Sequence, residues 1–234
     1  MEKRDPSNLL FVFLIYLSWI LIDEFIPYLN RIFDFRKINL WILPAVRMTL
    51  MFLVSYFYVK LYEKQSFSSG FNFSFNKIGK NILWAFVFFV IVGAFAMPYQ
   101  FLIVKPLTGE MKTASSVVSH NVVNPFVERL IEYLYIVYEG IIEVIIFVGF
   151  FLDRLAKRWN WPSALIVANI GFALWHYNYW RSGWLEGSLM IIMTFIMGII
   201  ISLSYVKTKN SLSPVICHTL VDSPNSIRIL LGMM

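Results

Sequence analysis

Five ionisable side chains lie inside apolar parts of the chain, and their residue types suit proton transfer. Glu139 and Glu143 lie in the segment EGIIEVIIF, His176 ends the segment FALWH, and His218 and Asp222 lie in the segment CHTLVD. A charged group near the centre of a bilayer costs about 2.5–3.5 kcal/mol on insertion scales, so ionisable residues inside a membrane are functional candidates by default. These residues therefore indicate a buried functional site.

A glutamate with two histidines favours the activation of water for hydrolysis of an amide bond. In a low-dielectric site Glu143 is a stronger base than in water. Of His176 and His218, one imidazole could share the water with it, and the other could stabilise the tetrahedral oxyanion. On a helix Asp222 lies one turn after His218, so its carboxylate could orient that imidazole. The same side chains suit a zinc ion by type and number, with Glu143, His176 and His218 as ligands. The sequence leaves the zinc-dependent and metal-free alternatives open.

Three glutamates predict an acidic face on one helix. Glu132, Glu139 and Glu143 are seven and four residues apart, so they share a helix side that must face protein or water rather than lipid. Glu132 lies near the end of its apolar run and is expected at the membrane interface.

The elements that hold these residues are predicted to be membrane-spanning helices. Of 234 residues, 59% are hydrophobic and 15% are charged, and the mean hydropathy of +0.67 excludes a soluble domain. The net charge of +6 comes from Lys and Arg between the apolar runs, which are expected to set the topology and contact lipid headgroups rather than nucleic acid. Cys217 is the single cysteine, so no internal disulfide is expected.

Hydropathy predicts seven spans, which makes the fold class all-α: a polytopic transmembrane helical bundle with its site on the C-terminal core helices. More Lys and Arg residues lie on the N-terminal side of this topology, so the N-terminus is expected in the cytoplasm. The predicted ranges are Asn8–Leu29, Ile38–Leu61, Asn81–Val104, Val127–Leu155, Trp161–Trp180, Trp184–Val206 and Ser211–Leu231.

Three short motifs resemble the CPBP family of intramembrane endopeptidases, also called Abi, which contains CAAX proteases and bacteriocin-processing enzymes. The family pattern is Glu-Glu-x-x-x-Arg, then Phe-x-x-x-His, then His-x-x-x-Asn or Asp, on successive core helices. Glu143 begins the first motif. Phe172 and His176 form the second motif, and His218 and Asp222 form the third. The order and placement of the motifs on apolar segments make the combination specific.

The first motif departs from the family pattern at two positions. Val144 stands where the family has its second glutamate, and Val148 stands where it has its arginine. Replacing both partners of a buried ion pair with apolar residues can be nearly neutral, whereas losing one leaves an unpaired charge. Glu139 lies one turn before Glu143 and could replace the missing acid, but no arginine is expected near it.

The resemblance implies an integral protein of a bacterial cell membrane that hydrolyses peptide bonds in peptides or membrane-protein segments. Its implied roles are bacteriocin maturation, self-immunity or the processing of signal peptides. Its implied partners are these substrates, the lipid bilayer and another membrane protein, with no cofactor apart from the zinc alternative. The N-terminal transmembrane helices and loops are expected in residues 1–126 and the core in residues 127–234. The implied catalytic residues are Glu143, His176, His218 and Asp222, with Glu139 and Phe172 in support.

Two other functions compete with proteolysis. The same fold could be a catalytically impaired pseudoprotease that acts as a membrane scaffold or immunity partner, because Val144 and Val148 break the first motif. A transporter with a relay of buried carboxylates is less favoured, because the sequence contains no inverted repeat or paired broken helices.

Overall fold

The structure is a computed structural model that describes residues 7–33, 42–111 and 125–231, and the regular elements in these ranges are helices. Several consecutive segments join end to end into longer helices, in which α4 continues through η3 into α5 and α6 continues through η5 into α7. The elements are α1 (Ser7–Phe33), α2 (Ile42–Phe57), η2 (Tyr58–Tyr62), α3 (Phe67–Gly70), α4 (Ile78–Tyr99), η3 (Gln100–Val104), α5 (Lys105–Thr108), α6 (Pro125–Val144), η5 (Ile145–Leu152), α7 (Asp153–Arg158), α8 (Trp161–Trp175), η6 (Tyr177–Ser182), α9 (Trp184–Thr208) and α10 (Leu212–Leu231).

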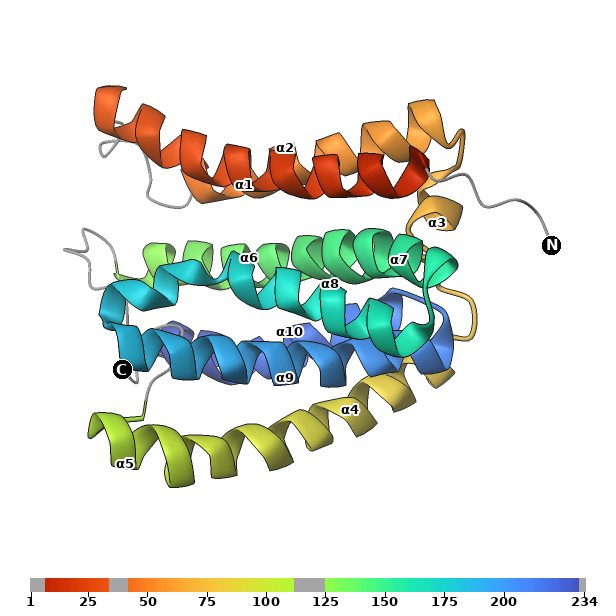
Figure 1. Cartoon of the computed structure of the whole chain (residues 1–234). Coiled ribbons are helices and arrows are strands. Elements are labelled where there is room, and N and C mark those ends of the chain that lie inside the picture. Colours follow the sequence, from red (N-terminus) through yellow and green to blue (C-terminus); the bar gives the residue numbers. More distant parts are fainter. Residues whose placement is uncertain (1–6, 34–41, 112–124, 232–234) are drawn as a thin grey trace.

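The helices that carry the three motifs lie in the middle of the bundle. In Figure 1, α1 and α2 run along one face and α4 with α5 runs along the opposite face. The helices α6, α7 and α8 lie next to the α1–α2 pair, and α9 and α10 lie between them and α4. Because α10 packs against both α6 and α4, its side chains can reach the acidic face of α6.

The prediction of an all-α membrane bundle is confirmed. Helices of the described residues occupy all seven predicted ranges. Three stretches there are long and apolar enough to cross a membrane, by length and composition: Ile78–Thr108, Tyr133–Arg158 and Trp184–Thr208. That the other four stretches also cross stays a prediction.

The predicted end of the fifth span at Trp180 is wrong, because α8 ends at Trp175. His176 has φ −87° and ψ 25°, outside the helical region. Its backbone N–H bonds to the carbonyl of Ala173, and the N–H of Tyr179 bonds to the carbonyl of His176 in the same tight i to i−3 pattern. The chain therefore turns into the 3₁₀ helix η6 directly after the histidine.

Aromatic packing fixes α1 against the π-helical segment η5. The Trp19 ring is fully buried and its centroid lies 5.3 Å from that of Phe147 and 6.0 Å from that of Phe150. Tyr16 stacks on Phe151 at 5.2 Å and donates a hydrogen bond to the carbonyl of Gly171 in α8. This core holds the helix that carries Glu143 in place from its C-terminal side.

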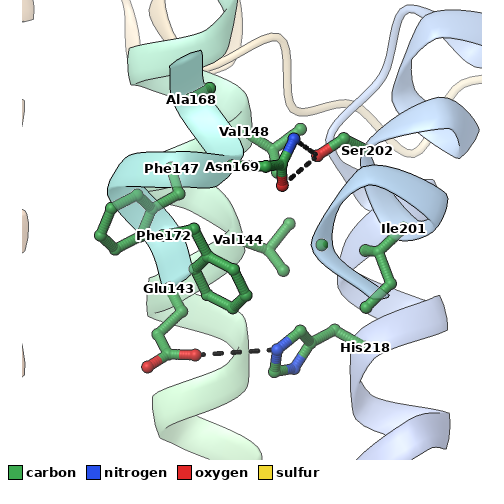
Figure 2. Close-up of a pocket in the computed structure, with 11 residues that line it drawn as sticks. Glu143, Val144, Phe147, Val148, Ala168, Asn169, Phe172, Ile201, Ser202 and His218 are labelled. Atoms are coloured by element: carbon green, nitrogen blue, oxygen red, sulfur yellow. Dashed lines mark hydrogen bonds and ion pairs between the residues drawn. The ribbon is translucent and has the colours of Figure 1, made fainter. Parts of the chain in front are cut away.

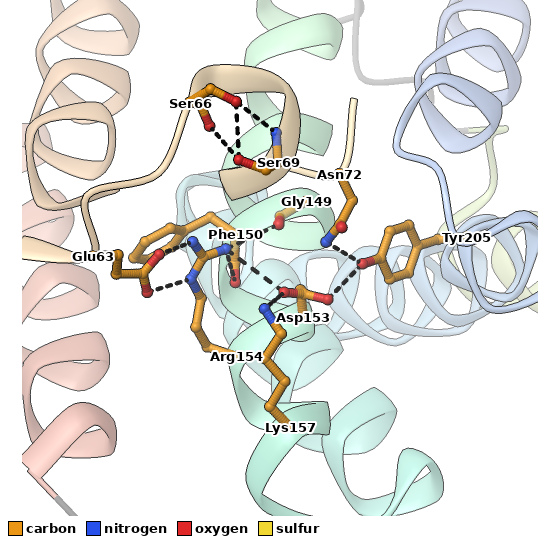
Figure 3. Close-up of polar contacts among 10 residues, drawn as sticks. All are labelled: Glu63, Ser66, Ser69, Asn72, Gly149, Phe150, Asp153, Arg154, Lys157 and Tyr205. Atoms are coloured by element: carbon orange, nitrogen blue, oxygen red, sulfur yellow. Dashed lines mark hydrogen bonds and ion pairs between the residues drawn. The ribbon is translucent and has the colours of Figure 1, made fainter. Parts of the chain in front are cut away.

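A buried arginine ties the far end of the same helix to the chain after α2 (Figure 3). Arg154 donates two hydrogen bonds to Glu63, from Nε at 3.1 Å and from Nη2 at 2.6 Å. Its Nη1 also donates to the carbonyls of Gly149 and Phe150. Because Arg154 follows Glu143 by eleven residues, this pair lies roughly 16 Å along the helix from that glutamate.

Candidate active site

Glu143 lies in the last turn of α6, directly before the π-helical segment η5, and is 5% exposed. π-helical segments inside α-helices are frequent at functional sites, because the extra residue per turn changes the direction of side chains. Figure 2 shows the Glu143 carboxylate turned toward His218 of α10, below the ring of Phe172.

His176 presents one ring nitrogen to Glu143 from the end of α8. Its Nδ1 lies 2.9 Å from the carbonyl oxygen of Phe172. Because a carbonyl only accepts hydrogen bonds, we assign the proton to Nδ1, which leaves a lone pair on Nε2 when the ring is neutral. That Nε2 lies 4.0 Å from Oε1 of Glu143.

His218 faces Glu143 from the opposite side, and Asp222 holds it there. Nε2 of His218 lies 3.7 Å from Oε2 of Glu143. Its Nδ1 lies 3.0 Å from Oδ2 of Asp222, one turn further along α10. A carboxylate on Nδ1 orients the imidazole and stabilises its charged form. The expected pairing of His218 with Asp222 is therefore present.

The structure thus brings together Glu143, His176 and His218 from three helices. Both imidazole Nε2 atoms face different oxygens of one carboxylate, at 4.0 Å and 3.7 Å. These separations are too long for direct hydrogen bonds and match polar groups that a water molecule bridges. The arrangement can hold a water between a base and two imidazoles.

Phe172 and Gly140 fit between the motif residues. The ring of Phe172 is edge-on to His176 at 4.8 Å and to His218 at 6.1 Å, so it fixes the spacing of the two imidazoles. Gly140 lies on α6 where a Cβ would come within 2.9 Å of Nδ1 of His218 and 3.4 Å of Oδ2 of Asp222. Only a glycine leaves α10 this close to α6.

A small cavity of about 10 Å³ continues from Glu143 and His218 between α6, α8 and α9. This is roughly the space that one water molecule needs. Val144 and Val148 line its wall, both nearly fully buried, and Asn169 with Ser202 closes its far end (Figure 2). Because both positions carry apolar side chains in place of the family's glutamate and arginine, neither adds an unpaired charge to the cavity.

The predicted absence of an arginine near Glu139 is wrong. Nη2 of Arg47 lies 3.5 Å from Oε1 of Glu139, and its Nη1 lies 2.5 Å from Oδ1 of Asp23. Tyr135 also donates a 2.7 Å hydrogen bond to Glu139. The packing of α2 against α6 brings Arg47 to the acidic face, so Glu139 interacts with α2.

Arg47 and Asp23 were not singled out from the sequence, although the criterion that indicated Glu143, an ionisable residue inside an apolar run, applies to them as well. Both are ionisable residues inside predicted spans, and Asp23 is 2% exposed. Tyr179 was also missed; its ring lies 5.5 Å from that of His176, on the turn after α8. The side chain of Glu132, predicted at the interface, lies outside the described part of the chain.

The residues fit a zinc site poorly as they are placed. Across the described ranges, no group of three or more His, Cys, Asp or Glu side chains is arranged to hold a metal ion. Asp222 contacts Nδ1 of His218, on the side of the ring away from Glu143, so it would orient that histidine rather than be a ligand beside Glu143. The chemistry proposed below is written with these side chains and water.

Comparison with known families adds the decisive observation for this segment. Residues 117–223, which include all three motifs, match the family described as type II CAAX prenyl endopeptidase Rce1-like. This motif-bearing segment is therefore similar to the CAAX-protease (CPBP) family. Searches of curated proteins and of solved structures gave no match. The long apolar helices of the chain, together with the family match, indicate an integral membrane protein.

Proposed function

We propose that this CAAX-protease relative hydrolyses peptide bonds inside the membrane with a water molecule activated by Glu143. The observation that carries the proposal is the convergence of two imidazole Nε2 atoms on one buried carboxylate, at 4.0 Å and 3.7 Å. The family match over the same residues supports it.

In the proposed reaction, a water lies between Glu143 and the two histidines. Glu143 accepts one proton from the water, whose oxygen attacks the substrate carbonyl carbon, and Nε2 of His176 accepts the second hydrogen in a hydrogen bond. The carbonyl oxygen becomes an oxyanion, which His218 stabilises through the N–H of Nε2 in its charged form. The C–N bond then breaks, and the proton on Glu143 passes to the leaving amine. Asp222 acts on His218 by orienting it.

The substrate class follows from the family and from the location of the site. The matching family is described as a CAAX prenyl endopeptidase, and the buried site favours a peptide or membrane-protein segment that enters from the lipid. Bacteriocin maturation, self-immunity and signal-peptide processing stay proposals, as do a bacterial membrane and a cytoplasmic N-terminus. The division of the chain into N-terminal helices, residues 1–126, and a core, residues 127–234, also stays a proposal.

The test is cleavage by the purified full chain in proteoliposomes. A farnesylated CAAX peptide and its unprenylated copy serve as probes, and products are identified by mass spectrometry in H₂¹⁸O. We expect one ¹⁸O in the new carboxyl group, loss of cleavage in His176→Ala and His218→Ala, and normal cleavage in Glu110→Gln, a change at an exposed position. Cleavage that survives both histidine substitutions would contradict the mechanism.

One observation favours a second function, that of a pseudoprotease acting as scaffold or immunity partner. Val144 and Val148 fill the wall of the cavity beside Glu143 with apolar groups. This alternative predicts a cellular phenotype that is insensitive to Glu143→Gln and a membrane partner that can be recovered by crosslinking.

A further inference from the structure

A second group of charged side chains lies one helical turn from Glu143, and Arg47 is its centre. The Arg47 side chain is 19% exposed and lies between two acids from different helices, Asp23 of α1 at 2.5 Å and Glu139 of α6 at 3.5 Å. Its guanidinium group is also 5.8 Å from the ring of Trp175, the residue before His176. The arginine therefore contacts the three elements that surround the site on this side.

Two tyrosines complete the group. Tyr135 donates a 2.7 Å hydrogen bond to the same Glu139 oxygen that faces Arg47. Tyr177 of η6 donates hydrogen bonds to Asp23, at 3.1 Å, and to Glu24. Arg47 therefore draws the Glu139 carboxylate toward α2, and Tyr135, one turn before Glu139 on α6, holds it on the side away from Glu143.

Three carboxylates lie close together at the site, and Arg47 offsets part of their mutual repulsion. Glu139 and Glu143 are four residues apart on α6, on the same helix face, and Asp222 is a third acid beside them. Carboxylates this close in a low-dielectric site repel each other strongly unless a cation is present. Among the described side chains, His218 lies on the Glu143 side of this group and Arg47 lies on the Glu139 side.

We propose that Arg47 is a positioning residue: it neutralises Glu139 and holds that carboxylate toward α2, so that Glu143 alone faces the two imidazoles. The proposal rests on the proposed function, because it assigns Arg47 a role in keeping Glu143 ready to accept a proton. Arg47 does not touch the reacting atoms and acts through Glu139.

Second-site suppression tests the proposal, with the proteoliposome assay and the peptide that wild type cleaves. Arg47→Gln should lower kcat about 10- to 100-fold with little change in KM, the loss expected when a catalytic group is misplaced. Adding Glu139→Gln should restore most of the lost kcat, because the uncompensated charge is gone. Adding Asp23→Asn instead should not restore it. Arg47→Lys should be intermediate, because it keeps the charge but loses the planar fork that reaches two acids.

Two results would overturn the proposal. In the first, adding Glu139→Gln to Arg47→Gln does not raise kcat. In the second, adding Asp23→Asn restores kcat instead, which would mean that Arg47 only connects α1 to α2. The matched control is Arg154→Gln, which breaks a buried arginine–glutamate pair further along the same helix and should lower thermal stability without lowering kcat.

A chain with no cleavage of either peptide would refute the proposed function instead. The link between Arg47 and Glu139 is then tested by thermal unfolding in detergent. The changes in melting temperature caused by Arg47→Gln and Glu139→Gln should be clearly non-additive in the double variant. Additive shifts would reject the link.

Discussion

The substitution Gly140→Ala should separate the geometry of the site from the stability of the fold. Gly140 is buried in α6, and an added Cβ would lie 2.9 Å from Nδ1 of His218. Ordinary van der Waals contact begins near 3.4 Å, so the imidazole or its helix must move by roughly 0.5 Å. Asp222 lies 3.4 Å from the same Cβ, which is ordinary contact, so the displacement falls on His218.

The size of the effect follows from these distances. A misplacement of 1 Å can cost about 100-fold in rate, so a shift of half that size should lower kcat about 10-fold. The methyl group should gain up to about 1 kcal/mol of helix propensity, and its overpacking against α10 should cost about 1–3 kcal/mol. Gly140→Ala should therefore fold, with a free energy of unfolding lowered by at most about 3 kcal/mol.

The assay is peptide cleavage in proteoliposomes at matched protein amounts, with thermal unfolding measured on the same preparations. Gly93→Ala is the control, since it makes the same change inside α4 with no atom within 4 Å of the added Cβ. It should keep full kcat. Gly140→Ala with wild-type kcat and wild-type stability would refute the reasoning, because His218 would then not depend on the close approach of α6 and α10.

Three further predictions concern other parts of the molecule. Arg154→Met should lower the free energy of unfolding by about 3–5 kcal/mol, because it leaves Glu63 unpaired. The double variant Arg154→Met with Glu63→Met should recover most of this loss, as measured by thermal unfolding in detergent. Equal losses in the single and double variants would show that the pair does not stabilise this end of the helix. Asp222→Asn should lose less of kcat than Asp222→Ala, because an amide oxygen still accepts a hydrogen bond from Nδ1 of His218 but no longer stabilises its charged form. Asp222→Ala should lose about 100-fold, and identical rates in the two variants would exclude the orienting role. A zinc chelator should leave cleavage unchanged, and inhibition that added zinc reverses would restore the metal-dependent alternative.

Much of the fold could be predicted because a bilayer restricts what an apolar run can form. Backbone groups in lipid must bond within their own helix, so a run such as Trp184–Val206 can only be helical, and the structure has α9 there. The positions of Glu143 and His218 were predictable for a related reason, since a buried charge costs too much to be incidental.

What could not be predicted depends on contacts between helices. Periodicity along α6 places Glu139 and Glu143 on one face but does not show which helix meets that face, so the contribution of Arg47 from α2 was missed. The end of α8 was also missed, because the run of aromatic residues after His176 continues a helical pattern. The structure ends the helix there by a switch to i to i−3 hydrogen bonds.

The most direct test of the account is the rate of peptide cleavage by Glu143→Gln beside wild type, at equal membrane amounts. Glutamine keeps the shape of the side chain but cannot accept a proton from water, so the substitution tests the chemistry rather than the fold. We expect cleavage to fall by at least about 100-fold, the size of one general-base contribution, with unchanged thermal stability. Cleavage at the wild-type rate in Glu143→Gln would contradict the account.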